Sequence, residues 1–223
     1  MDRYVMGITQ QIGASSLIKP GVIDNTAARP ASPYEGQVIF QKDTDQLLVW
    51  NGTAWVIPNS PAQNPQGLEL IKTQTIGSAV SSVEVTGAFN STYDNYKIVV
   101  SGGASSQQTS IYMILGASTG TYYGTYLYAS YATGTPQGAA INNQTNFIYA
   151  GGADIAVLNV NIELQNPFLA KYTNIQALTV NYASIRGHAV GEHETASSYT
   201  SFTLAPYSGT LTGGTIAVYG YRK

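Results

Sequence analysis

The sequence contains no cysteine among its 223 residues, which excludes a disulfide scaffold and thiol chemistry. Because secreted monomers often rely on disulfides, this absence favours a protein that folds in a cytoplasm and gains stability from assembly. No apolar run approaches the length of about 18 residues that a membrane-spanning helix needs. The N-terminus also lacks the hydrophobic core of a signal peptide.

Charge is scarce as well. Only 10% of the residues are charged, against about a quarter in a typical globular protein. The sequence pI of 5.6 and the lack of basic clusters argue against nucleic-acid binding, which depends on Lys and Arg neutralising phosphates. Hydrophobic residues make up 43% of the chain and the net charge is only −2, so the composition is that of a folded protein with a neutral polar surface.

Residues 67–223 predict an antiparallel β-sandwich, jelly-roll-like, without helices. Short segments alternate apolar and polar residues, as a strand does when one face is buried and the other is wet. Turns rich in Gly, Ser, Thr and Asn separate them. The apolar members of the strongest alternations are Val83 and Val85, Tyr96, Ile98 and Val100, Ile111, Met113 and Leu115, Leu158, Val160, Ile162 and Leu164, Leu178, Val180 and Tyr182, Phe202 and Leu204, and Ile216 and Val218.

Residues 21–57 predict a small three-stranded meander. The expected strands are 37–41, 46–50 and 53–57. Asn51-Gly52 is the strongest hairpin signal in the chain, because a type I′ turn requires positive φ at both central residues. A unit this small cannot bury enough apolar surface to be stable alone, so it needs a partner.

Two further segments complete the expected organisation. Residues 58–66 form a linker, because their closely spaced prolines favour an extended spacer. Residues 1–20 mix apolar and polar positions with two glycines, which disfavours a long helix. This segment is either an attachment segment that docks on another protein or a simple chain end.

The meander resembles a segment found in fibre proteins of tailed bacteriophages. The resemblance lies in Arg29-Pro30-Ala31-Ser32-Pro33, Glu35-Gly36-Gln37-Val38-Ile39, Asp43-Thr44-Asp45 and Val49-Trp50-Asn51-Gly52-Thr53-Ala54-Trp55. A second resemblance, to a C-terminal domain of such proteins, spans most of residues 67–223. It is strongest at its ends, in Gly67-Leu68-Glu69-Leu70-Ile71, Phe89-Asn90-Ser91-Thr92-Tyr93-Asp94-Asn95-Tyr96-Lys97-Ile98 and Gly213-Gly214-Thr215-Ile216-Ala217-Val218-Tyr219-Gly220-Tyr221-Arg222.

The resemblance implies a virion protein, a short tail fibre subunit that is threefold and attached to the particle by its N-terminus. The expected partners are two further copies of the chain, a baseplate, tail or capsid protein, and a host-surface glycan or protein. The residues expected to attach the subunit are Tyr4, Val5, Ile8 and Ile12, and those expected in the oligomerisation core are Phe40, Trp50, Trp55, Tyr219 and Tyr221. A capsid-attached fibre or head decoration protein is an alternative, and a free carbohydrate-binding lectin is another.

A tyrosine-rich stretch suggests where a receptor is bound. Tyr122, Tyr123, Tyr126, Tyr128 and Tyr131 fall within ten residues. Tyrosine offers a flat apolar ring and a hydroxyl, which suits sugars and protein epitopes. The alternative is that these rings pack between subunits or stabilise an ordinary sheet.

Catalytic and metal-binding signals are weak. His188 and His193 lie near Glu192 and Glu194, but the spacing matches no metal motif, and the flanking glycines indicate a solvated hairpin tip. There is no nucleophile elbow or phosphate loop. Acidic residues on or beside the predicted strands, Asp154, Glu163, Glu69 and Glu84, show no convergent pattern. We therefore expect neither an enzyme nor a metal or cofactor site.

Overall fold

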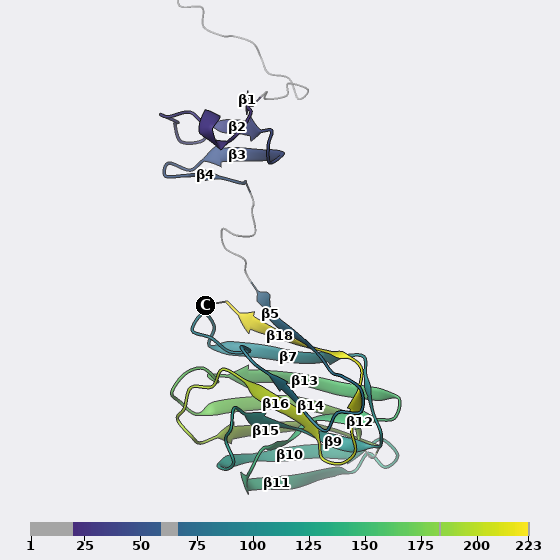
Figure 1. Cartoon of the computed structure of the whole chain (residues 1–223). Helices are drawn as coiled ribbons and strands as arrows, with labels where there is room; N and C mark the ends of the chain where they lie inside the picture. Colours follow the sequence, from purple (N-terminus) through teal and green to yellow (C-terminus); the bar gives the residue numbers. More distant parts are fainter. Residues whose placement is uncertain (1–19, 59–66, 183, 223) are drawn as a thin grey trace, which may run out of the picture. The chain divides into compact units, whose positions relative to one another are not determined.

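The computed structural model describes residues 20–58, 67–182 and 184–222 (Figure 1). Within these ranges the chain is all-β, with one short 3-10 helix (η1, Thr26–Ala28) and no α-helix. No helix of the described residues is long and apolar enough to cross a membrane. The chain divides into two compact units, residues 1–64 and 65–223. The residues expected to attach the subunit, Tyr4, Val5, Ile8 and Ile12, lie outside the described ranges.

The first unit holds a four-stranded sheet in the order β1-β2-β3-β4. The expected meander had three strands, and the structure adds a parallel strand at one edge: β1 (Gly21–Ile23) pairs with β2 (Val38–Gln41). Strands β3 (Gln46–Trp50) and β4 (Trp55–Val56) then follow as antiparallel neighbours.

The turn between β3 and β4 differs from the expected two-residue type I′ turn. Gly52 has a positive φ of 91°, but Asn51 does not have the positive φ that such a turn requires. The loop spans four residues, since Asn51 N–H donates to the Ala54 carbonyl. The Asn51 side chain accepts hydrogen bonds from the backbone N–H groups of Thr53 and Ala54, at 3.0 and 2.8 Å. This side-chain turn replaces the backbone geometry that the dipeptide predicted.

The four-stranded sheet has two unlike faces. Ile39 and Leu48 are buried on one face, where Trp50 and Trp55 form an edge-to-face pair at 5.7 Å. The other face is apolar and half-buried to exposed, and its side chains are Val22, Val38, Phe40, Leu47, Val49 and Val56. Phe40 and the two tryptophans thus lie on opposite faces, so they cannot all belong to one flat contact surface.

The second unit is a β-sandwich of twelve paired strands (Figure 1). Its larger layer has eight strands in the order β5 (Leu68–Thr75), β18 (Thr215–Tyr221), β7 (Asn95–Ser101), β13 (Val157–Gln165), β14 (Thr173–Tyr182), β15 (Ile185–His193), β10 (Tyr122–Ser130) and β11 (Pro136–Gln144). Its smaller layer runs β6 (Val83–Val85), β16 (Phe202–Pro206), β9 (Thr109–Leu115) and β12 (Phe147–Asp154). A separate pair joins β8 (Ala104–Ser105) to β17 (Leu211–Thr212).

Strand β13 links the two layers. Its first half pairs with β12, whereas its second half lies between β7 and β14. Leu158, Val160, Ile162 and Leu164 all point into the core and are nearly fully buried, as their alternation predicted.

On strand β14 the predicted alternation is reversed, since its apolar member Leu178 lies on the outer face of the sheet instead of in the core. On β14 the buried residues are Thr173, Ile175, Ala177 and Thr179, while Leu178 is 50% exposed. The smaller side chains are inside because β12 packs closely there, and the Thr179 hydroxyl donates to the Tyr149 carbonyl at 3.1 Å. Leu178 therefore belongs to the outer face of the eight-stranded layer.

The sandwich unit is closed by its first and last strands. Strand β18 lies between β5 and β7, and Arg222 N–H donates to the Gly67 carbonyl where the two ends of the unit meet. Gly220 leaves room there for the Tyr93 ring, which a Cβ atom at this position would overlap.

Candidate binding surface

The five tyrosines predicted as a receptor surface occupy different environments. Because side chains alternate along β10, Tyr122 and Tyr126 point into the core and are 0% and 1% exposed. Their assignment to a receptor surface is therefore wrong. Tyr123 points to the outer face, Tyr128 is half-buried, and Tyr131 is 69% exposed beneath the Arg186 guanidinium.

Tyr126 is the centre of an aromatic stack. Its ring lies 4.9 Å from that of Tyr128 and 4.2 Å from that of Tyr149, with interplanar angles below 20°. Gly187 on β15 makes this possible, since a Cβ atom there would overlap the Tyr126 ring and the Leu127 carbonyl. Gly187 and Gly191 are thus strand residues rather than parts of a hairpin tip, and the loop interpretation of this region is wrong.

His193, expected on the same solvated tip, is fully buried at the end of β15. Its ring stacks on Tyr122 at 4.1 Å. Nδ1 lies 3.3 Å from the Thr121 carbonyl oxygen and 3.2 Å from the Thr121 hydroxyl oxygen. Nε2 lies 2.8 Å from the Tyr199 hydroxyl and 3.0 Å from the Ser118 hydroxyl. Burial lowers the pKa of His193, and the bond to Thr121 opposes this shift in part.

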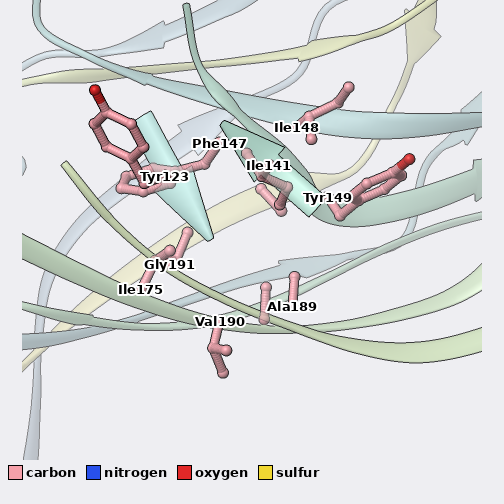
Figure 2. Close-up of a pocket in the computed structure, with 11 residues that line it drawn as sticks. Tyr123, Ile141, Phe147, Ile148, Tyr149, Ile175, Ala189, Val190 and Gly191 are labelled. Atoms are coloured by element: carbon pink, nitrogen blue, oxygen red, sulfur yellow. The ribbon is translucent and has the colours of Figure 1, made fainter. Parts of the chain in front are cut away.

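A small cavity lies between the two layers near these residues (Figure 2). Side chains of β11 and β12, including Ile141, Phe147 and Tyr149, line it together with Ile175 and Ala189 of β14 and β15. Its volume of about 10 Å³ is no more than a water molecule requires, and its lining is apolar. This space belongs to the packing of the core and is not a ligand site.

The outer face of the eight-stranded layer is more open. Its side chains form rows across the strands, because residues in register on neighbouring strands point the same way. One row is Lys97, Glu163, Gln176, Val190 and Thr125. A second is Asn95, Gln165, Asn174, Glu192 and Tyr123, and a third contains Leu178, His188 and Leu127.

Three shallow depressions lie on this outer face. The first, of about 330 Å³, is lined by Tyr123, Thr125, Asn174, Val190 and Glu192 among others. The second and third, of about 300 and 240 Å³, are neighbours because Glu163 and Gln176 line both. Amide, carboxylate, imidazole and phenol groups therefore gather on a single face of a rigid sheet.

Glu163 is the most strongly held of these groups. The Lys97 ammonium donates to its Oε1 at 2.5 Å and the Tyr221 hydroxyl donates to its Oε2 at 2.7 Å. Lys97 also donates to Asn161 Oδ1 at 3.0 Å. The hydrogen bond to Glu163 raises the pKa of Tyr221 to about 12, so this hydroxyl stays protonated at neutral pH.

Tyr219 and Tyr221, expected in an oligomerisation core, both lie on the outer face of β18. Tyr221 contributes to the second depression, whereas Tyr219 is half-buried beside Lys97. The sequence singled out Tyr123 and Tyr221 but not their neighbours Lys97, Asn161 and Gln176. The polar positions of the β13 alternation were the available signal, because they mark the strand face that holds Asn161 and Glu163.

Within residues 20–58, 67–182 and 184–222, no three His, Cys, Asp or Glu side chains are grouped so that they could hold a metal ion. His188 is exposed on the outer face and His193 is buried on the inner face, so they point away from each other.

Comparison of the chain with protein-family models, with curated proteins and with solved structures gives no significant match.

Proposed function

We propose that this chain is a non-enzymatic subunit of a phage-type virion fibre that recognises carbohydrate on the host surface through its sandwich unit. The observation that carries the proposal is the outer face of the eight-stranded layer, where three shallow depressions are lined by polar and aromatic side chains. The resemblance of residues 29–55 and of most of residues 67–223 to phage fibre segments, strongest at the two ends of the second range, supports the virion setting.

Carbohydrate suits this surface better than other ligand classes. Sugar hydroxyls donate and accept hydrogen bonds, as amides and carboxylates do, and the apolar face of a sugar ring packs on tyrosine. Nucleic acid would need a basic surface, and this chain has a net charge of −2. The depressions are open and shallow, as expected for a surface that binds part of a longer polymer.

We expect the full-length chain to bind members of a glycan array of neutral and acidic oligosaccharides. Tyr123→Ala removes an aromatic wall of the first depression and should weaken that binding about tenfold, as the loss of an interfacial tyrosine commonly does. The matched control is Tyr207→Ala, since Tyr207 is 70% exposed and does not line any of the three outer-face depressions. Absence of binding to every glycan would refute the carbohydrate proposal.

The first unit supports assembly into a fibre. Of its described hydrophobic side chains only Ile39 and Leu48 are buried, which is too small a core for independent stability. Its open apolar face, formed by Val22, Val38, Phe40, Leu47, Val49 and Val56, is suited to contact with the same face of other copies.

Light scattering on the full-length chain should give three times the 23.7 kDa monomer mass, or about 71 kDa. Leu47→Lys places a charge on the open face, so the faces of two copies should no longer pack together and the mass should fall to that of the monomer. The variant should still fold, because Leu47 is already 43% exposed and its replacement leaves the core intact. Leu127→Lys, at a 64% exposed position of the other unit, is the control and should leave the mass unchanged. A wild-type monomer would argue against the fibre and raise the free lectin alternative.

A further inference from the structure

The second and third depressions on the outer face adjoin each other, and we treat them as one trough. Glu163 and Gln176 lie between them and line both. Asn95, Gln165 and Tyr221 extend the trough on one side, and Lys97, Asn161 and His188 extend it on the other. We refer to this feature as the Glu163 trough.

The carboxylate in this trough is fixed in orientation but retains hydrogen-bonding capacity. Each of its oxygens accepts one hydrogen bond, from Lys97 and from Tyr221 respectively. An ionised carboxylate has about four acceptor positions, so each oxygen can accept another donor. Because its side chain is already held, Glu163 loses little rotamer freedom when it binds a ligand.

The remaining groups of the trough complement a ring that bears several hydroxyls. The Gln176 amide and the His188 imidazole are exposed, and among the described residues neither side chain makes a hydrogen bond. Both can donate and accept. The Tyr221 ring, which is 36% exposed, adds a flat apolar surface beside the carboxylate.

The charges in the trough disfavour an acidic ligand. The cation of Lys97 is paired with Glu163 and bonded to Asn161, so it is not available to a second anion without loss of these contacts. Glu192 adds another negative charge on the same outer face. A ligand carboxylate in the trough would therefore meet an already compensated cation and the Glu163 carboxylate, whereas neutral hydroxyls meet acceptors that suit them.

We propose that the Glu163 trough binds a neutral sugar unit, with vicinal hydroxyls donating to the Glu163 carboxylate and the ring packed against Tyr221. This inference rests on the carbohydrate-binding function proposed above and specifies the ligand class and the residues. The competing occupant is another copy of this chain, covering Tyr219 and Tyr221. The polar lining favours the sugar, because the centre of a subunit interface is normally depleted of charged residues.

The test measures binding of the full-length chain to the neutral and acidic oligosaccharides of the array, followed by titration with the best ligand. Wild type should prefer neutral members. Glu163→Gln should weaken binding of the best ligand by about tenfold or more, as expected for loss of a charge-assisted hydrogen bond. Gln176→Ala should also weaken it, and this exposed residue can be replaced without disturbing the core. Glu84→Gln, an exposed carboxylate on β6 of the smaller layer, is the matched control.

Three outcomes would overturn the proposal. Wild-type affinity of both trough variants would place the sugar elsewhere, for example at Tyr123, while leaving carbohydrate binding intact. A preference for acidic glycans would contradict the charge argument. A fall in the mass of Glu163→Gln by light scattering would identify the trough as a contact between copies. If no glycan binds even the wild type, the proposed function fails and the trough proposal fails with it.

Discussion

Replacing Tyr126 with alanine should lower the free energy of unfolding by about 3–5 kcal/mol, the range for removal of a large buried aromatic side chain. Tyr126 is 1% exposed and stacks on both Tyr128 and Tyr149. Gly187 lies against the ring and has no side chain, so this residue cannot fill the space that the ring leaves. Urea denaturation at neutral pH measures the change.

The control for this variant is Tyr207→Ala, at a position that is 70% exposed. A surface substitution of this kind should change the stability by about 0.5 kcal/mol or less. If Tyr126→Ala were equally mild, the stack would not exist in solution and Tyr126 would again be a candidate for ligand contact. A loss of glycan binding in Tyr126→Ala, by contrast, would reflect unfolding and carry no information on the binding surface.

Acid should destabilise the sandwich unit through His193. Burial lowers the pKa of this side chain in the folded state below its ordinary value of 6.5, so the unfolded chain takes up the proton first. The part of the free energy of unfolding that depends on a neutral His193 is fully present above pH 6.5. It declines as the pH falls from there toward the folded-state pKa of His193. The slope contributed by one proton reaches at most about 1.4 kcal/mol per pH unit.

The hydrogen-bonding partners that the structure describes for His193 include no charged group that would fully offset the lowering of its pKa by burial. Among the described residues, its hydrogen-bonding partners are the hydroxyl or carbonyl groups of Ser118, Thr121 and Tyr199, and none is a carboxylate that would stabilise an imidazolium. Urea denaturation between pH 7.5 and 5.5 should show the decline in wild type and in His188→Gln, whose histidine is exposed. His193→Gln should abolish it, and a slope that persisted in this variant would assign the acid sensitivity to another group.

Strict alternation explains which parts of the fold were predictable. The strand 95–101 and the inward residues of β13 follow from period two, because each has apolar side chains on its inner face and mainly polar ones on the other. The tyrosine-rich strand β10 offers no such contrast, since tyrosines stand on both of its faces. Only the partners of the strand decide that Tyr122 and Tyr126 point inward and Tyr123 outward.

The prediction of a loop at the glycines and histidines of β15 was wrong for a related reason. Gly187 and Gly191 indicated a loop from local sequence, but they serve contacts with Tyr126 and with the Tyr123 backbone, which lie more than 60 positions earlier in the chain. The partners of His193 come from two separate stretches, Ser118 and Thr121 from one and Tyr199 from the other. The Glu163 trough likewise brings together Lys97, Glu163 and Tyr221. These residues are so far apart in the chain that no local sequence pattern could have predicted the site.

The position of β18 between β5 and β7 bears on how the protein is made. Residues 68–75 and 95–101 emerge from the ribosome long before residues 215–221, the strand that separates them in the sheet. During synthesis both strands therefore present unpaired backbone edges, and nothing yet covers the ring of Tyr93 that Gly220 later accommodates. Pairings this distant along the chain form slowly, and the exposed edges favour association between nascent chains. If the chain assembles from identical copies, as proposed above, the interval before β18 forms is when correct folding competes most directly with premature contact between neighbouring polypeptides.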